Sequence, residues 1–188
     1  RSLLARIERS AARANALLEV LLSPSRAGRT ELDHRDVDMT ALARDAFAQV
    51  RTADEDGDVE LVLEPLPPAH GDAALLGGVF ANLFSNALKY SRGVEKRRVV
   101  VSGRIEDDEC IYEIADNGCG FDMRFAPKLF KVFERLHASD AVEGTGVGLA
   151  TVERVVRRHR GRVWAWGAVG EGARFSFALP RKEPVQDD

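Results

Sequence analysis

The chain has 188 residues, of which 45% are hydrophobic and 30% charged, and its 27 Lys and Arg against 30 Asp and Glu give a formal net charge of −3. This composition excludes a disordered chain, and the charge balance excludes a nucleic-acid binder driven by bulk positive charge. Two cysteines, Cys110 and Cys119, are too few for a disulfide framework or a four-cysteine zinc site. Because no apolar run approaches the ~18 residues that span a bilayer, we expect a cytoplasmic chain without membrane contact.

The first 24 residues predict one long helix. Apolar side chains recur at spacings of three and four, the a/d pattern of a helix that packs lengthwise against others, and they are Leu4, Ile7, Ala11, Ala14, Leu18 and Leu21. Ser23-Pro24 ends this helix, because proline moves the preceding residue out of helical conformation. The helix lies either on its own domain or, as the narrow stripe favours, in a bundle or dimer. Residues 25–38 form a linker with a short strand within 31–37.

Residues 39–181 predict an α+β domain. Helices are expected, in order, over residues 39–50, 72–90, 124–133 and 147–158, with Asp38 and Asp72 as N-terminal caps of the first two. Strands are expected over residues 59–63, 98–105, 110–115, 162–167 and 173–179. This order indicates one mixed sheet with helices on one face, rather than the strict βαβ alternation of a dinucleotide-binding domain. Residues 182–188 are expected to form a frayed tail.

Two glycine-rich clusters stand where backbone amides can approach an anion. Residues 116–120 (DNGCG) follow a predicted strand. Residues 144–148 (GTGVG) open a predicted helix, whose positive dipole end favours negative charge. Turns alone explain most such clusters. Neither cluster matches the glycine pattern of a P-loop or of a dinucleotide-binding loop.

The predicted helix over residues 72–90 carries a polar stripe. Asn82, Asn86 and Lys89 share one face by their spacing, and Tyr90 follows them. Amides and an amine on an otherwise apolar helix are costly unless they face a ligand. Taken alone, however, these residues favour a solvent-exposed outer face.

Together these segments resemble four ordered motifs of sensor histidine kinases. Residues 82–90 (NLFSNALKY) resemble the N box and residues 116–121 (DNGCGF) the G1 box. Residues 130–135 (FKVFER) resemble the F box and residues 144–150 (GTGVGLA) the G2 box. Their order and separation agree with that family, and residues 125–166 are most similar to bacteriophytochrome and PAS-linked two-component kinases. The resemblance covers nearly the whole chain.

The resemblance implies a Bergerat-type α/β sandwich that binds ATP and Mg²⁺ and is preceded by one long bundle helix. In that family pattern Asp116 accepts a hydrogen bond from the adenine amino group, and Asn86 is the Mg²⁺ ligand. Asn82, Asn86, Lys89 and Arg135 are the expected catalytic residues, with Lys89 and Arg135 near the phosphates. The other expected nucleotide contacts are Tyr90, Gly118, Gly120, Phe121, Gly144, Thr145, Gly146, Val147, Gly148 and Leu149.

The resemblance also implies phosphoryl transfer rather than hydrolysis. Gyrase-, Hsp90- and MutL-type ATPases resemble one another in a glutamate, four residues before the metal-binding Asn, that orients water. Here that position is Asn82, and an amide cannot act as a general base. We therefore expect transfer of the ATP γ-phosphoryl group to a histidine on a helical hairpin, for relay to a response regulator. A degenerate ATP-binding scaffold and a related ATPase are the alternatives.

No histidine lies on the predicted N-terminal helix. The four histidines fall in the linker, a proline-rich turn, a lid loop and a helix end, and they are His34, His70, His137 and His159. The N-terminal helix is thus similar to the second helix of a dimerisation hairpin whose first helix and acceptor histidine are absent from this chain. We expect a homodimer through this helix, and no phosphorylation of the chain by itself.

Overall fold

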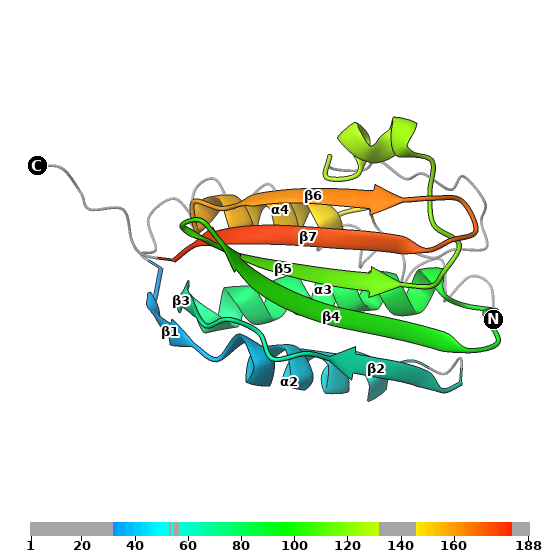
Figure 1. Ribbon diagram of the computed structural model, residues 1–188, viewed down its shortest axis with the longest axis horizontal. Coiled ribbons are helices and arrows are strands. Elements are labelled where there is room, and N and C mark those ends of the chain that lie inside the picture. Colours follow the sequence, from blue (N-terminus) through cyan, green and yellow to red (C-terminus); the bar gives the residue numbers. More distant parts are fainter. Residues whose placement is uncertain (1–31, 53, 55–56, 132–145, 182–188) are drawn as a thin grey trace, which may run out of the picture.

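The computed structural model describes residues 32–52, 54, 57–131 and 146–181, in which a five-stranded sheet has the order β2-β4-β5-β7-β6 (Figure 1). The strands are β2 (Val59–Leu63), β4 (Arg97–Glu106), β5 (Glu109–Asp116), β6 (Arg162–Gly167) and β7 (Ala173–Pro180). β2 and β4 are parallel, whereas the other neighbours are antiparallel. The predicted mixed sheet is therefore confirmed.

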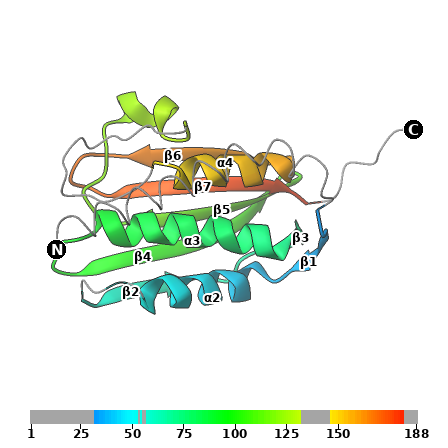
Figure 2. The same cartoon turned by 180° about the vertical axis from the view of Figure 1, so that it is seen from behind.

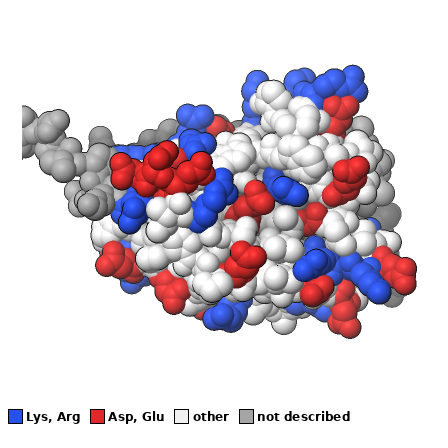
Figure 3. Space-filling model, in the orientation of Figure 1, with Lys and Arg blue, Asp and Glu red and all other residues white. Residues whose placement is uncertain are grey.

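Helices cover one face of this sheet (Figure 2). α2 (Met39–Thr52) lies beside β2, α3 (Ala73–Tyr90) lies in the middle, and α4 (Gly148–Arg158) lies over β6 and β7. The 3₁₀ helix η1 (Met123–Lys128) lies beyond the β6 edge of the sheet. The opposite face of the sheet has no such cover and mixes acidic with basic side chains (Figure 3). This arrangement is the predicted α+β sandwich.

The helix starts follow from local sequence. Asp38 caps α2 by accepting a hydrogen bond from the Ala41 backbone N–H at 3.0 Å. Asp72 caps α3 by accepting bonds from the backbone N–H groups of Ala74 and Leu75, both at 3.1 Å. Each carboxylate thus pairs amides that have no partner within the helix. Both caps agree with the sequence-based prediction.

α3 forms the centre of the hydrophobic core. Its buried residues recur at spacings of three and four, and they are Leu76, Val79, Phe80, Leu83, Phe84, Ala87 and Leu88. The Phe80 ring meets Phe177 of β7 edge-on at 5.7 Å, and the Tyr112 ring of β5 stacks on Phe177 at 4.9 Å. Interlocked aromatic rings hold the apolar side of α3 on the sheet, and truncation of one such ring to alanine typically costs about 3–5 kcal/mol.

The short strand expected within residues 31–37 is confirmed, but its partner strand and the small second sheet that the two form were not predicted. β1 (Arg35–Val37) pairs antiparallel with β3 (Ala69–Gly71), so that Asp36 lies opposite His70. The placement of His70 in a proline-rich turn is therefore wrong. β3 has only three residues and pairs with a distant segment, so no periodicity in the sequence predicts it.

The expected helix over residues 124–133 is also only partly confirmed. The described segment is the short 3₁₀ helix η1, which contains Pro127. Proline lacks the N–H that an α-helix would need there, so the tighter and shorter form results. The predicted N-terminal helix, the first part of the linker, the end of this segment and the tail lie outside the described residues.

Three histidines that are far apart in the sequence meet where β1, β3, the start of α3 and the end of α4 come together. The His34 ring lies 5.6 Å from the His70 ring and 5.8 Å from the His159 ring, between centroids. His159 is buried; its Nδ1–H donates to the Val155 carbonyl at 2.8 Å, and its Nε2 accepts from the Asp72 N–H at 3.0 Å. These bonds fix a neutral His159 ring with its proton on Nδ1.

The free energy of unfolding should therefore fall as the pH drops below about 6.5. Burial lowers the pKa of His159 from 6.5, His34 and Arg158 add to this effect, and the Val155 carbonyl and Asp72 oppose it. The folded state then binds fewer protons than the unfolded state in that range. Urea denaturation between pH 5 and 8 measures the slope. His159→Gln, which removes the titrating ring, should flatten it; an unchanged slope would assign the dependence to other groups.

Candidate functional site

The start of α4 packs against the middle of α3. Gly148 is the first residue of α4, and a Cβ atom at this position would lie 2.8 Å from Oδ1 of Asn82. Asn82 Nδ2 donates to the Gly78 carbonyl of its own helix at 2.8 Å, so its oxygen faces the first turn of α4. Glycine alone leaves room for this approach. The predicted N-box and G2-box residues are thus brought together.

Among the described residues, no side chain caps the backbone amides in the first turn of α4. Val147 occupies the cap position, is buried and makes no side-chain hydrogen bond to the helix. Gly146 before it has a φ of +72°, which glycine adopts without strain. Leu149 is half-buried against the core. An uncapped helix N-terminus offers amide donors and positive partial charge to an anion such as phosphate.

The loop after β5 lies against the last turn of α3. The Cys119 N–H donates to the Tyr90 carbonyl at 3.0 Å. A Cβ atom on Gly118 would collide with the same carbonyl group of Tyr90. Gly120 has a φ of +60°, and a Cβ atom there would collide with the Ala168 carbonyl after β6. Backbone contact on two sides therefore requires glycine at both positions.

Two further residues of this loop make contacts that the sequence did not indicate. Asn117 ties the loop to the start of β4: Oδ1 accepts from the Arg98 N–H at 2.8 Å, and Nδ2 donates to the Lys96 carbonyl at 2.7 Å. Phe121, predicted as a nucleotide contact, is buried, and its ring packs against Gly167. No local pattern marks Asn117, because its partners Arg98 and Lys96 lie far from it in the sequence.

Asp116 is the last residue of β5 and has a perturbed acidity. Its Oδ1 accepts from the Gly118 N–H at 2.9 Å. Burial raises the pKa of Asp116 from 3.8 to about 6, although hydrogen bonds from the backbone of Gly118 and Ala173 act in the opposite direction. Ionising this carboxyl at neutral pH costs on the order of 3 kcal/mol. A ligand that donates a hydrogen bond here would offset part of that cost, and such perturbed groups concentrate at functional sites.

The polar side of α3 connects these two loops. Lys89 Nζ lies 3.5 Å from the Tyr90 hydroxyl and 4.7 Å from the centre of its ring. Asn86 is half-buried one turn earlier. From Tyr90, beside the Asp116 loop, to Asn82, beside α4, the helix rises about 12 Å. The predicted contacts Gly144 and Thr145, and the predicted catalytic Arg135, lie outside the described residues.

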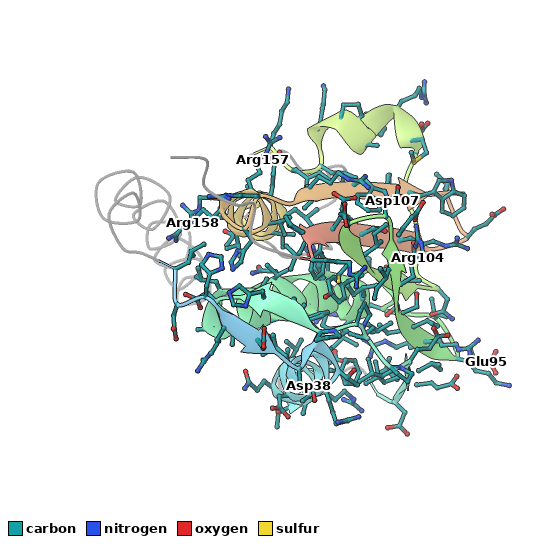
Figure 4. All side chains as sticks on the ribbon, turned by 60° about the vertical axis from the view of Figure 1, so that its left-hand side comes forward. Asp38, Glu95, Arg104, Asp107, Arg157 and Arg158 are labelled. Carbon is teal, nitrogen blue, oxygen red and sulfur yellow. The ribbon has the colours of Figure 1, made fainter. Side chains whose placement is uncertain are left out.

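The outer side of α4 borders a hollow of about 610 Å³. Its lining includes Phe130, Thr151, Glu153 and Arg157, whereas Val152 and Val155 face the core. Arg157 pairs with Glu153 at 2.8 Å. Arg157 and Arg158 leave the end of α4 in different directions (Figure 4). The hollow therefore lies on the side of α4 away from Asn82.

Two negative findings apply to the part of the chain that the structure describes. No helix there is long and apolar enough to cross a membrane. No group of three or more His, Cys, Asp or Glu side chains in those same ranges could hold a metal ion. The Asn86 amide oxygen and the phosphate oxygens of a nucleotide are of the ligand type that Mg²⁺ prefers.

The chain is similar to known ATP-binding signalling proteins. The family described as histidine kinase-, DNA gyrase B- and HSP90-like ATPase matches residues 71–183. Cyanobacterial phytochrome A of a Nostoc species is 34% identical over 135 residues, 72% of this chain and 18% of that protein. The signal transduction histidine-protein kinase AtoS of Escherichia coli is 31% identical over 169 residues, 88% of this chain and 27% of that protein. The chain spans about a fifth of the length of the phytochrome relatives that it matches.

Solved structures give the same result. The mycobacterial sensor histidine kinase MprB superimposes with a TM-score of 0.67 at 29% identity, over 78% of this chain and 97% of that one. Full-length ShkA, in complex with AMPPNP, superimposes with a TM-score of 0.74 at 25% identity, over 96% of this chain and 38% of that one. The chain belongs to the histidine kinase-, DNA gyrase B- and HSP90-like ATPase family, and residues 71–183 form an ATP-binding domain of the sensor histidine kinase type.

Proposed function

We propose that this chain transfers the γ-phosphoryl group of ATP to a histidine on a helical hairpin, as the catalytic part of a two-component sensor histidine kinase. The proposal rests on the positions of two ligand-binding features along α3, one at its C-terminal end and one at its middle. The half-buried carboxyl of Asp116 lies at the C-terminal end of α3, and the start of α4, which Val147 does not cap, lies beside Asn82. An adenine amino group suits the first position and the phosphates suit the second.

The groups between these positions match the middle of the nucleotide. Asn86 offers an amide oxygen to Mg²⁺, a hard cation that prefers oxygen ligands and keeps part of its coordination for water and phosphate. Bound there with ATP, Mg²⁺ would neutralise charge on the phosphates. Lys89 adds positive charge at the end of α3, and Tyr90 offers a ring beside the base. The solved complex of the similar ShkA with AMPPNP, an ATP analogue, supports the nucleotide assignment.

Asn82 supports transfer rather than hydrolysis. Its side chain joins α3 to α4 through the Gly78 carbonyl and the close approach of Gly148. An amide takes no proton from water, so the site holds no general base at this position. Reaction then depends on a second nucleophile brought to the γ-phosphate, and most of its rate comes from positioning and charge stabilisation.

The acceptor in this proposal is a histidine outside the described domain. His34, His70 and His159 cluster at the N-terminal end of α3, whereas the proposed phosphate position lies beside Asn82, in the middle of that helix. Asp72 and Asn82 are ten residues apart, which separates the two places by about 15 Å along α3. His137 lies outside the described residues. A response regulator that receives the phosphoryl group, and a homodimer formed through residues 1–24, complete the proposal.

Asp116→Asn should weaken ATP binding while it stabilises the empty fold. The amide can place a donor against the adenine amino group, which should cost about 1–3 kcal/mol of binding free energy. It also removes a buried charge, so the free energy of unfolding at pH 7 should rise, by up to about 3 kcal/mol. Calorimetric titration with Mg-ATP and urea denaturation measure the two effects.

Glu113→Gln, on the same strand, is the matched control for Asp116→Asn. Glu113 lies on the uncovered face of the sheet, where it accepts from Ser176 Oγ at 3.2 Å. This variant should change ATP affinity by less than about two-fold, because its side chain lies away from α3. Unchanged ATP affinity of Asp116→Asn would contradict the adenine assignment.

The chain alone should bind γ-labelled ATP without becoming labelled, and a hairpin that carries an acceptor histidine should become labelled when it is added. The reason is that the reacting groups must be held in line before transfer occurs. Phosphate release and acid-labile label are measured in the same reactions, with Asn86→Ala as the inactive control. Rapid phosphate release without transfer would instead indicate an ATPase, and binding with neither reaction a scaffold. Label on any of the chain's own four histidines would contradict the predicted lack of an acceptor.

A further inference from the structure

We propose that Arg97, the first residue of β4, is a positioning residue for the nucleotide site. Its buried side chain holds the last turn of α3, and with it Lys89 and Tyr90, against the loop that carries Asp116. The inference rests on the proposed ATP-binding role of those residues. Nothing in the motifs points to Arg97, which lies outside all four of them.

The guanidinium of Arg97 makes three directional contacts, to two other segments of the chain. Arg97 is 4% exposed. Its Nη2 donates to the Leu88 carbonyl at 2.8 Å, and its Nε donates to Ser91 Oγ at 3.3 Å. Its Nη1 donates to Oδ2 of Asp54 at 2.7 Å, and the Asp54 side chain is itself only 6% exposed. One buried side chain thus joins β4, the segment after α2 and the end of α3.

These contacts act on the end of α3 that carries the site. The last carbonyls of a helix have no partner within it, and Arg97 supplies a partner for the Leu88 carbonyl, directly before Lys89. Ser91 continues the same network, because its Oγ donates to the Ala87 carbonyl at 2.7 Å. A planar guanidinium fixes direction as well as distance.

The backbone beside Arg97 holds the opposing wall. Lys96 and Arg98 flank it in the sequence, and their backbone groups bind both ends of the Asn117 side-chain amide. Cys119, two residues further along that loop, donates to the Tyr90 carbonyl. Three successive residues at the start of β4, Lys96 before the strand and Arg97 and Arg98 within it, therefore contact both α3 and the Asp116 loop.

A purely structural role is the competing explanation. A buried ion pair is poor stabilisation by itself, because desolvation offsets most of the attraction, and apolar side chains of similar size often replace such pairs without loss. If the pair served packing alone, methionine in place of Arg97 and leucine in place of Asp54 would therefore suffice. Neither apolar side chain could make the hydrogen bonds that Arg97 donates to Leu88 and Ser91. A structural role and a positioning role therefore predict different ATP affinities when Arg97 and Asp54 are both replaced by apolar residues.

Three variants separate these roles by ATP affinity and stability. Asp54→Asn alters the ion pair but leaves the bonds from Arg97 to α3, so its ATP affinity should stay within about two-fold of the native value. Arg97→Met should lose affinity about ten-fold or more, because small misplacements at a site are costly, and should also lose stability. The double variant Asp54→Leu with Arg97→Met should recover stability but not affinity. Arg98→Met, whose exposed side chain pairs with Glu60, is the control and should change neither.

Amide hydrogen exchange without nucleotide gives a second readout that does not depend on the proposed function. The amides of Cys119, bonded to Tyr90, and Ser91, bonded to the Ala87 carbonyl, should exchange faster in the double variant than in the native chain and in Asp54→Asn. Recovery of ATP affinity in the double variant, or native exchange at both amides, would overturn the proposal. If the native chain binds no ATP, the proposed function fails, and the exchange rates alone decide the role of Arg97.

Discussion

The candidate site depends on a contact of backbone with backbone. Residues 118–120 pass between the last turn of α3 and the turn from β6 to β7, so closely that a Cβ atom at Gly118 or Gly120 would collide with a carbonyl group. Backbone groups are paired in this contact: the Cys119 N–H donates to Tyr90, and the Cys119 carbonyl accepts from Gly170 at 2.8 Å. These hydrogen bonds and the close approaches of Gly118 and Gly120 hold the loop from both sides, so it has little freedom to shift. Asp116 consequently has a fixed place relative to Lys89 and Tyr90.

That fixed place is maintained at the expense of stability, and the core compensates for it. The pKa of Asp116, raised to about 6 by burial, means that the charged carboxylate opposes folding at neutral pH. The aromatic contacts of Phe80 and Tyr112 with Phe177 lie in the core between α3 and the sheet. Buried rings of this size typically contribute several kcal/mol each to the free energy of unfolding, which offsets the cost of one desolvated carboxylate. A site that prepares an acceptor for a ligand in advance is expected to carry such a cost.

Local chemistry explains which parts of this fold could be predicted. The strand over residues 59–63 and the cap of α3 at Asp72 match the expectations, because periodicity and capping are written into neighbouring residues. β3, the histidine cluster and the Arg97–Asp54 pair were missed, because each joins segments that only the tertiary fold brings together. In the site, Gly118 and Gly120 indicated a turn or a close backbone contact, but their spacing did not indicate that the contacts are with Tyr90 and Ala168. The order of the motifs, as a family resemblance, supplied the nucleotide assignment, which remains a proposal for the individual residues.

The two ends of α3 are tied to different parts of the chain, and this gives the helix a role beyond its own residues. At its start, the Asp72 carboxylate accepts from the Asp33 N–H at 3.4 Å, and the Asp72 N–H donates to His159, so the segment that enters the domain and the end of α4 meet at one cap. At its end, Arg97 holds the Leu88 carbonyl and Cys119 holds that of Tyr90. Between these ends a continuous apolar side is buried in the core. Because α3 is one continuous helix packed along its length, it sets the Asp72 cap and the Tyr90 end of the candidate site at a defined position relative to each other.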